Sequence, residues 1–200
     1  MHLSKEKTLV IIKPDGVQRS LIGEVIGRLE RVGLKLVAID MSVPTEEKIR
    51  AHYLVDPEWR RKAGQKSIDA YKNKGLDCPF SDPVEAGEKV LNNLAKYMTS
   101  GPVVSMVWQG AHAVPVVRKI VGSTEPLSSD VGTIRGDFVL DSYQMSDVNS
   151  RSVRNLIHAS GSNEDAEAEI KHWFALEKII NYRLIQEQIL YDVNLDGFLE

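Results

Sequence analysis

Short apolar runs of strand length alternate along this chain with segments of helical period, and this alternation limits the folds that the chain can adopt. Residues 8–12, 34–41 and 103–108 are rich in β-branched and aliphatic side chains, and residues 155–158 end a fourth short strand. Between the strands, apolar residues recur at helical spacing, as they do in residues 22–29. Four strands interleaved with helices predict an α/β sandwich, in which helices pack against a single sheet.

Residues of types that favour helix ends flank the helical segments. They are Ser20 before and Gly33 after residues 22–29, Thr45 before a short helix that runs to Tyr53, and Ser162 before a helix over residues 163–174. A further helix is expected over residues 115–121, where Pro115 is tolerated because it lies in the first turn. Strand order cannot be derived from such periodicity.

Two polar stretches interrupt the alternation. Residues 54–88 are interpreted as an insertion with one or two small helices, after which residues 90–98 resume a helical period. Residues 141–152 form a second, smaller insertion, and residues 122–137 form a long loop of the kind that is often functional. The C-terminal tail, residues 177–200, is expected to continue as a helix and then a loose end. A single domain therefore spans the chain.

The composition limits the class of protein. Its 200 residues suit one domain, and 42% hydrophobic with 26% charged residues is ordinary for a globular chain with a sizeable core. The formal net charge of -3 gives no sign of a surface dedicated to nucleic acid. The single cysteine, Cys78, favours a reducing compartment. Neither an apolar run of the roughly 20 residues of a membrane span nor a signal region is found, so a cytoplasmic protein with no membrane partner is expected.

Several nucleotide-binding and metal-binding classes are disfavoured by motifs that the sequence lacks. It has no G-x-x-x-x-G-K-[ST] loop, no glycine-rich dinucleotide fingerprint after a strand, and no cysteine–histidine metal spacing. Residues 192–197 copy the first half of a calcium loop. The sequence ends before the position of the bidentate glutamate, which argues against calcium binding.

Three cations stand at the ends of apolar elements. Lys13 directly follows the first strand, Arg118 lies in a helix otherwise lined with valines, and Arg135 lies in the glycine-flanked loop. Phosphoryl transfer needs positive charge around a polyphosphate, which these side chains would supply if they converged. The alternative is that each is an exposed charge or the partner of a nearby carboxylate.

His158 is the strongest candidate nucleophile. It closes an apolar run and is followed by small residues that leave its ring accessible, although a histidine at a strand end is more often structural than catalytic. Glu169 borders the apolar arc of the next helix, and a carboxylate half-turned toward a core needs a partner. A hydrogen bond between Glu169 and one ring nitrogen would fix the tautomer and leave the other nitrogen as a neutral nucleophile. The residues alone do not show that the nucleophile and the cations meet.

Four motifs in this chain resemble those of nucleoside diphosphate kinases and occur in the order of that family. They are Lys-Pro-Asp-Gly-Val-Gln-Arg at 13–19, Tyr-Met-Thr-Ser-Gly-Pro-Val-Val at 97–104 followed by Met-Val-Trp at 106–108, Gly-Thr-Ile-Arg-Gly-Asp-Phe at 132–138, and Asn-Leu-Ile-His-Ala-Ser at 155–160. Each motif alone is moderately specific, but all of them in order are very hard to obtain by chance. The chain is identified as a variant member of this family with two insertions and an extended tail.

The resemblance implies a ferredoxin-like fold, with helices packed on a four-stranded antiparallel sheet, and assembly into a homo-oligomer, either a hexamer or a tetramer. It implies that the γ-phosphate of a nucleoside triphosphate passes to a nucleoside diphosphate by a ping-pong mechanism, through a phosphohistidine on His158. Mg²⁺ is the implied cofactor, held mainly by nucleotide phosphates and by no protein side chain.

The resemblance also assigns roles to residues that match the family's motifs. His158 accepts the phosphate, Ser160 and Glu169 hold that histidine in place, Lys13 and Tyr53 lie near the transferring phosphate, Arg118, Thr124 and Arg135 bind phosphate, and Asn155 contacts the sugar.

The chain departs from the family at a few positions. Members commonly have glycine after the catalytic histidine and an aspartate two positions further on, where this chain has Ala159 and Gly161. Alanine would cost energy if that position needed a positive φ. Residues 54–88 fall where the family places the helices that grip the base, and Phe80 is a weak candidate for stacking on it.

Two other functions are weighed against the kinase. A regulatory module would keep the fold without the catalysis, but every position needed to handle phosphate is occupied. A nucleic-acid-binding protein is disfavoured by the net charge of -3 and by the lack of a basic stripe with interleaved aromatic residues.

Overall fold

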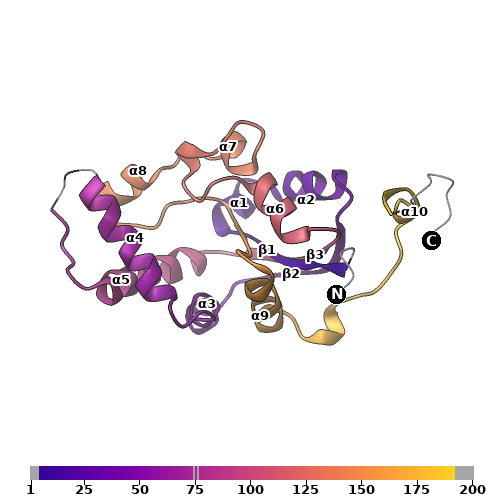
Figure 1. Cartoon of the computed structure of the whole chain (residues 1–200), viewed down its shortest axis with the longest axis horizontal. Helices are drawn as coiled ribbons and strands as arrows, with labels where there is room; N and C mark the ends of the chain where they lie inside the picture. Colours follow the sequence, from indigo (N-terminus) through magenta and orange to yellow (C-terminus); the bar gives the residue numbers. More distant parts are fainter. Residues whose placement is uncertain (1–4, 74, 76, 192–200) are drawn as a thin grey trace.

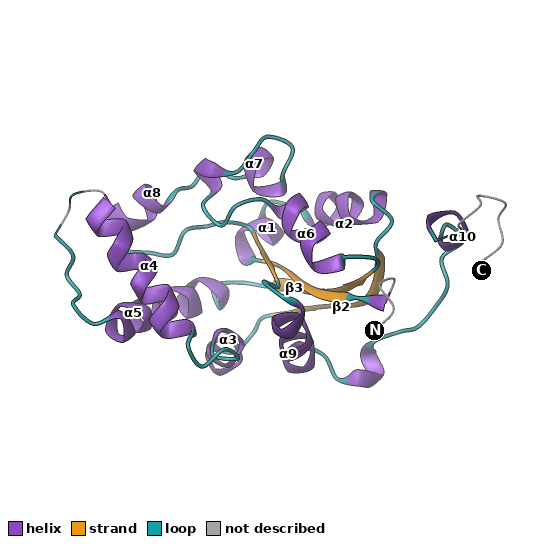
Figure 2. Ribbon diagram, in the orientation of Figure 1, coloured by secondary structure: helices purple, strands orange, loops and turns teal. Residues whose placement is uncertain are grey.

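The computed structural model describes residues 5–73, 75 and 77–191, and its centre is a four-stranded sheet with the order β2-β3-β1-β4. The strands are β1 (Lys7–Ile12), β2 (Lys35–Ser42), β3 (Val103–Gln109) and β4 (Ile157–Ala159). Every neighbouring pair of strands is antiparallel. Helices lie on both sides of the sheet in Figure 1 and Figure 2. The fold expected from the sequence, a four-stranded antiparallel sheet with helices packed on it, is confirmed.

Strand β1 occupies an inner position in the sheet and is apolar along almost its whole length. Its residues from Leu9 to Ile12 are fully buried. Successive side chains of a strand point to opposite faces, and accordingly Val10 and Ile12 join one core cluster while Leu9 and Ile11 join the other. Because both faces of β1 are covered, the strand reads in the sequence as a continuous apolar run.

One face of the sheet is covered mainly by the helices α2 (Ile22–Arg31) and α6 (Ala113–Val121). The shorter helices α1 (Pro14–Gln18) and α7 (Ile134–Phe138) lie on the same side. Val25 and Leu29 of α2 and Val117 of α6 are fully buried in the cluster on this face. Pro115 lies in the first turn of α6, as predicted.

The other face carries a second, separate core. It is covered by α3 (Glu46–Tyr53), by α9 (Asn163–Trp173) and by the C-terminal end of α5 (Pro83–Met98). Ile49 of α3 and Met98 of α5 are fully buried there, with Trp173 of α9 nearby. The sheet therefore stands between two apolar layers, and its strand ends are the places where polar side chains emerge.

Two of the predicted helix caps are present, and one is wrong. The side chain of Thr45 accepts the Lys48 N–H at the start of α3, and the side chain of Ser162 accepts the Asp165 N–H at the start of α9. Ser20 does not cap α2, because the chain turns directly from α1 into α2 and Ser20 itself has a φ of 57°. Gly33, with a φ of 90°, follows the end of α2 as expected.

Residues 54–88 were expected to hold one or two small helices, and they form part of a longer helical hairpin instead. Helix α4 (Trp59–Asn73) has 15 residues, and α5 begins at Pro83, earlier than the helical period predicts. The glycines that suggested breaks form the contact between these helices. A Cβ on Gly64 would lie 1.7 Å from the Pro83 carbonyl oxygen, and one on Gly87 would lie 1.9 Å from a carbonyl oxygen of α4. Close packing thus offsets the usual cost of glycine inside a helix.

The segment between α6 and β4 contains more helix than predicted. The expected loop over residues 122–137 includes the short helix η2 (Pro126–Ser128) and most of α7, so Arg135 lies on a helix and not in a loop. Thr133 caps α7 by accepting the Gly136 N–H. The second expected insertion contains α8 (Tyr143–Val148). In the described ranges no helix combines the length and the apolar character needed to cross a membrane.

The C-terminal tail does not continue α9 as a helix, contrary to the prediction. Phe174 ends α9 in an extended conformation, and from there to residue 191, where the described part of the tail stops, the helical elements are η3 (Leu176–Lys178) and α10 (Glu187–Leu190). The Ile180 N–H donates to the Val37 oxygen of β2 over 2.8 Å, so the tail follows the sheet edge before it reaches α10. In Figure 1, α10 and the α4–α5 hairpin lie at opposite ends of the molecule. The partial calcium loop, residues 192–197, lies outside the described residues.

Candidate active site

Strand pairing brings residues from opposite ends of the chain together. His158 of β4 lies opposite Ile11 of β1, and Ile157 lies opposite Ile12. The Lys13 N–H continues this pairing by donating to the Leu156 oxygen over 2.8 Å. Lys13 and His158 therefore emerge near each other, although His158 is in the middle of β4 and not at its end as predicted.

His158 is held by a carboxylate and a hydroxyl. Its Nε2 atom lies 3.1 Å from Oε2 of Glu169, and the Ser160 hydroxyl donates to the same oxygen over 2.7 Å. The Leu9 N–H donates to the Ser160 oxygen over 3.1 Å, which fixes that hydroxyl to β1. Glu169 is only 8% exposed, so the carboxylate that the sequence placed beside the core has these two partners.

The charge on Glu169 determines the tautomer of His158. Burial alone would raise the pKa of Glu169, but the charge and hydrogen bond of His158, together with His52 and Ser160, lower the pKa to about 2. The carboxylate is therefore ionised near neutral pH and can only accept hydrogen bonds. His158 Nε2 consequently carries the ring hydrogen, and the lone pair of Nδ1 remains available as a nucleophile.

Lys13 is nearly buried beside this histidine, with 4% of its surface exposed. Its Nζ atom donates to Oδ1 of Asn155 over 2.7 Å. Burial, followed by the charge of Arg135, lowers the pKa of Lys13 to about 7, while Asp15 acts in the opposite direction. An anion bound at this position would favour the charged form of the lysine.

Arg135 is buried, and it joins two backbone segments in addition to carrying a positive charge. Only 7% of it is exposed, and its guanidinium donates to backbone oxygens of two separate segments. These acceptors are Asn155 at 3.2 Å, Gly122 at 2.9 Å, Ser123 at 3.0 Å and Ile157 at 2.7 Å. Since a guanidinium has five N–H groups, these contacts leave about one for a ligand. Burial and the charge of Arg118 lower the pKa of Arg135 to about 10, while tyrosines including Tyr143 oppose this.

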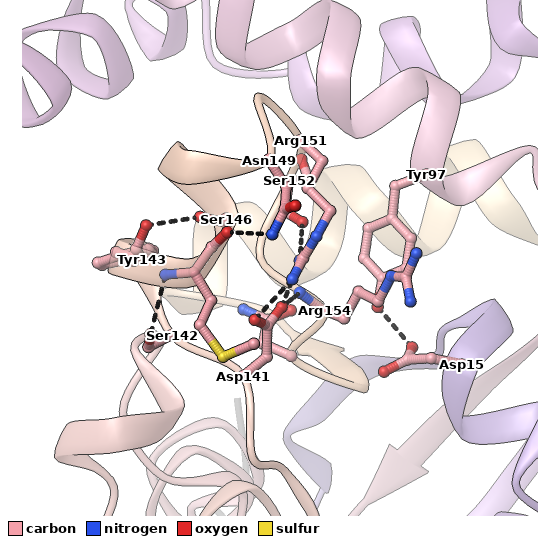
Figure 3. Close-up of polar contacts among 12 residues, drawn as sticks. Asp15, Tyr97, Asp141, Ser142, Tyr143, Ser146, Asn149, Arg151, Ser152 and Arg154 are labelled. Atoms are coloured by element: carbon pink, nitrogen blue, oxygen red, sulfur yellow. Dashed lines mark hydrogen bonds and ion pairs between the residues drawn. The ribbon is translucent and has the colours of Figure 1, made fainter.

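Asn155 joins these pieces through its side-chain amide. Its Oδ1 accepts the Lys13 ammonium, and its Nδ2 donates to the Thr124 oxygen over 3.0 Å. The segment that leads into Asn155 is held by Asp141, whose carboxylate pairs with Arg151 at 2.5 and 2.9 Å and accepts the Arg154 N–H at 2.7 Å. Figure 3 shows these contacts closing the loop that carries α8.

Arg118 and Tyr53 complete the set of predicted site residues, at its periphery. Arg118 is exposed and lines a pocket of about 520 Å³ with residues 161–164 at the N-terminal end of α9. Its charge acts on Arg135, so both arginines lie in one region. The Tyr53 ring lies against that of His52, with 4.8 Å between their centroids, and burial and then the charge of Glu169 raise the pKa of Tyr53. The structure thus gathers all the predicted residues into one region, with Lys13, Arg135, Asn155 and Thr124 linked by direct contacts.

His52 is a site residue that no pattern in the sequence singles out. It is 2% exposed, its ring centroid lies 4.6 Å from that of His158, and the two rings are nearly perpendicular. Its Nδ1 accepts the indole N–H of Trp173 over 3.2 Å, while its Nε2 finds no partner among the described residues. Burial and then the charge of His158 hold the pKa of His52 well below its usual value. The only hint in the sequence is its position next to Tyr53.

The departures from the family pattern are accommodated without strain. Ala159 is an ordinary residue of β4, and it is not among the described residues with positive φ. The cost considered for alanine at this position therefore does not arise. A Cβ on Gly161 would lie 2.8 Å from a carboxylate oxygen of Asp165, a flexible side chain. Phe80 is partly buried in the connection between α4 and α5, whereas Trp59 of α4 places its ring 5.1 Å from that of Tyr53.

The described side chains offer one group of three possible metal ligands, and its chemistry does not suit magnesium. In the ranges that the structure covers, one group can bring three metal-binding atoms within 4.8 Å of one another, namely His52, His158 and Glu169. Magnesium prefers an octahedral set of oxygen ligands, whereas imidazole nitrogens suit zinc or copper. These residues therefore do not fit Mg²⁺ on their own.

Comparison with known proteins decides the family. A model described as "Nucleoside diphosphate kinase" matches residues 6–63 and 83–179. The chain belongs to the nucleoside diphosphate kinase family. Every predicted site residue falls inside the matched ranges, and the gap between the two ranges, residues 64–82, runs from within α4 to the start of α5.

Curated relatives and solved structures agree with this family. A nucleoside diphosphate kinase from Pyrobaculum aerophilum is 48% identical over 88% of this chain and 98% of the relative, and one from Borreliella burgdorferi is 40% identical over 89% and 92%. A crystal structure of an NDP kinase from Pyrobaculum aerophilum has a TM-score of 0.85 and 46% identity, covering 88% of this chain and all of that one. A structure from Borrelia burgdorferi, described as a transition state mimic with bound vanadate and ADP, has a TM-score of 0.75 and 38% identity, covering 92% and 96%.

Proposed function

We propose that this chain is a nucleoside diphosphate kinase that moves the γ-phosphate of a nucleoside triphosphate to a nucleoside diphosphate through a phosphohistidine on His158. The observation that carries the proposal is the 3.1 Å contact between Nε2 of His158 and the buried carboxylate of Glu169. Glu169 accepts the hydrogen of Nε2, which leaves the lone pair of Nδ1 free to attack phosphorus. A histidine carrier divides the transfer into two similar half-reactions, so one pocket serves both donor and acceptor.

In the first half-reaction, Nδ1 of His158 forms a bond to the γ-phosphorus while the bond from that phosphorus to the β,γ-bridging oxygen breaks, and the diphosphate leaves. The imidazole ring becomes positively charged, and the ionised Glu169 stabilises this charge through Nε2. The second half-reaction is the reverse, with a different diphosphate as the acceptor.

Positive charge around the phosphate oxygens lowers the barrier to this transfer. Lys13 and the remaining N–H of Arg135 face the transferring phosphate in this proposal, and Arg118 and Thr124 bind the phosphates that follow. The Tyr53 ring contacts the ring of His52, which in turn contacts the ring of His158. Asn155 contacts the sugar. Because these contacts are to phosphate and sugar, the same site accepts several bases.

Magnesium enters this scheme as part of the substrate. Nucleotide phosphates supply the oxygen ligands that the ion prefers, and the protein holds the complex through its cations. We infer that the substrate is the Mg²⁺ complex of a nucleotide.

We also propose that the chain forms a homo-oligomer, either a hexamer or a tetramer. Two groups of exposed apolar side chains support this. They are Ile39, Met41 and Val43 at the end of β2, an edge strand, and Leu127, Val131 and Leu140 around α7. Exposed apolar groups of this kind often mark contacts between subunits. A molar mass in solution equal to that of a single chain would refute the proposal.

The rest of the chain is assigned by the same proposal. We propose one domain over residues 1–200, with insertions at about 54–88 and 141–152 and a tail at about 177–200, acting in the cytoplasm on nucleotides and not on nucleic acid or membranes. The lone Cys78 fits a reducing compartment.

Incubation of the purified protein with γ-labelled ATP and Mg²⁺, without an acceptor, tests the activity. Wild-type protein is expected to take up acid-labile label and to release it to several unlabelled diphosphates. His158→Ala is expected to take up none. A folded wild-type protein that binds nucleotide and takes up no label would refute the proposed function.

His172→Ala is the matched control, because His172 is a partly buried histidine whose Nε2 donates to the Lys48 oxygen over 2.8 Å. This substitution removes an imidazole from the same helix as Glu169 without touching His158. It is expected to leave labelling within about threefold of wild type, a range typical of changes outside the reacting groups.

A further inference from the structure

Asp15 and Tyr97 form a polar pair directly beside Lys13. The Tyr97 hydroxyl, on α5, donates to Oδ1 of Asp15, on α1, over 2.5 Å. The same Tyr97 ring lies under Lys13, with 5.4 Å between Nζ and the ring centroid. One tyrosine therefore touches both a carboxylate and the ammonium group, and Figure 3 shows it reaching Asp15 beside the loop that leads to Asn155.

Lys13 has little else to support a positive charge in the free protein. It is nearly buried, and its hydrogen bond to Asn155 involves a neutral amide. The groups that act on its charge are Arg135 from α7, which disfavours it, and Asp15 from α1, which favours it. His52 from α3 also senses the charge of Lys13. Asp15 thus supplies the negative charge that opposes burial and Arg135.

We propose that Asp15, held in place by the Tyr97 hydroxyl, keeps the Lys13 ammonium charged and directed toward the phosphates, with the Tyr97 ring as its floor. Asp15 and Tyr97 are thereby positioning residues for phosphoryl transfer. This inference rests on the proposed role of Lys13 in binding the transferring phosphate.

The sign of the effect follows from electrostatics. A nearby carboxylate favours the protonated form of an amine, so removing the Asp15 charge makes Lys13 release its proton at a lower pH. A bound nucleotide brings its own negative charge and restores the ammonium. The loss is therefore expected in the encounter between free enzyme and substrate, which means a larger change in KM than in kcat.

Two variants separate the parts of the pair. Asp15→Asn keeps an oxygen that can accept the Tyr97 hydroxyl but removes the charge. Tyr97→Phe keeps the ring under Lys13 but removes the hydroxyl that fixes Asp15. A matched control for the second is Tyr182→Phe, because the Tyr182 ring lies 5.5 Å from the Lys35 ammonium and its hydroxyl donates to the Leu36 oxygen over 2.8 Å, in the tail. Asp69→Asn, an exposed aspartate on α4, is the control for the first.

The direct test follows the ionisation of Lys13 itself in the nucleotide-free protein. Lysine side chains are labelled with ¹³C, the Lys13 signal is assigned by its loss in Lys13→Arg, and its shift is followed from about pH 5 to about pH 11, a range that covers normal and lowered lysine values. Asp15→Asn is expected to lower the midpoint by at least about half a pH unit. Tyr97→Phe should lower it less, and the two controls not at all. An unchanged midpoint in Asp15→Asn would overturn the proposal.

The kinetic test compares wild type with Asp15→Asn across pH. The deficit of the variant in kcat/KM is expected to widen from less than about twofold near pH 6.5 to about threefold or more near pH 8.5, because both proteins lose the charged lysine as pH rises and the variant loses it at a lower pH. A deficit that stays constant with pH would indicate a merely structural role and would contradict the proposal. The NMR titration needs no catalysis, so a wild-type protein without activity refutes the kinase while the titration still decides the role of Asp15.

Discussion

His158 and Glu169 meet through Nε2 and Oε2 at 3.1 Å, across the junction between β4 and the helix that follows it. Ser160 donates to the same oxygen from the end of the strand. The pair explains how one short segment of the sequence forms a nucleophile. Strand β4 carries the His158 ring, α9 places the Glu169 carboxylate beside it, and the carboxylate determines the tautomer of the ring. The consequences of this relationship can be measured.

Replacing Glu169 by glutamine is expected to slow labelling of His158 by roughly 10- to 1,000-fold, a loss in the range known for misplaced general acid–base partners. The amide can donate to Nε2, which would favour the tautomer with the hydrogen on Nδ1 and block the attacking lone pair. Single-turnover labelling measures the rate. Glu167→Gln, an exposed residue of the same helix, is the control. Equal rates in the two variants would contradict the assigned role.

Glu169 should also make the free energy of unfolding depend on pH in the acid range. Its pKa is about 2 in the folded protein, below the ordinary value of 4.5. A carboxyl group whose pKa is depressed by folding stabilises the protein above the unfolded pKa, and this contribution disappears as pH falls toward the folded value. A shift of this size corresponds to about 3 kcal/mol. Urea unfolding measures the free energy of unfolding between about pH 6 and pH 3. This free energy should fall with pH in the wild type and fall less in Glu169→Gln. Parallel plots of the free energy against pH for the two proteins would contradict the prediction.

Arg135 is expected to contribute to stability as well as to catalysis. Replacing it by lysine removes the fork that serves backbone oxygens of Gly122, Ser123, Asn155 and Ile157. We expect a loss of about 2–4 kcal/mol in the free energy of unfolding, because several buried acceptors lose their donor. The exposed Arg154→Lys should cost less than about 0.5 kcal/mol. Similar denaturant midpoints for both variants would show that the buried contacts matter little.

Asp141 is expected to keep the α8 loop closed. Asp141→Asn loses the charge that pairs with Arg151 from both oxygens, so the loop should open more often and trypsin should cleave faster after Arg151 and Arg154. Because Asn155 follows this loop, KM for the nucleotide should rise. Gln144→Ala, an exposed change on α8, is the control for cleavage and KM. Unchanged cleavage in Asp141→Asn would remove the basis for this role.

The sequence predicts the sheet and much of the site because the responsible patterns are local. Strands β1 and β3 are mostly apolar, and the caps Thr45 and Ser162 lie directly before the helices that they start. Glu169 could be paired with His158 because strand, turn and helix follow one another in the chain. The antiparallel pairing of the strands and the roles of the other site residues are implied by the family resemblance, and the local patterns do not show them.

The parts that were mispredicted depend on contacts between distant residues. Gly64 and Gly87 suggest breaks when each is considered alone, yet each makes room for the other helix. Gly132 and Gly136 on either side of Arg135 predict a loop, whereas in the structure Thr133 caps a helix that contains Arg135. His52 and the Asp15–Tyr97 pair became visible only when the fold placed them beside His158 and Lys13. The tail seemed helical, but it is bonded to β2.

The position of the phosphate on His158 tests the central claim most directly. Protein with ¹⁵N-labelled histidine is phosphorylated with a nucleoside triphosphate and Mg²⁺, and the coupling between phosphorus and nitrogen identifies the bonded atom. We predict that the phosphorus is bonded to Nδ1 of His158, because Glu169 holds the hydrogen on Nε2. A phosphate on Nε2, or on a residue other than His158, would contradict the mechanism.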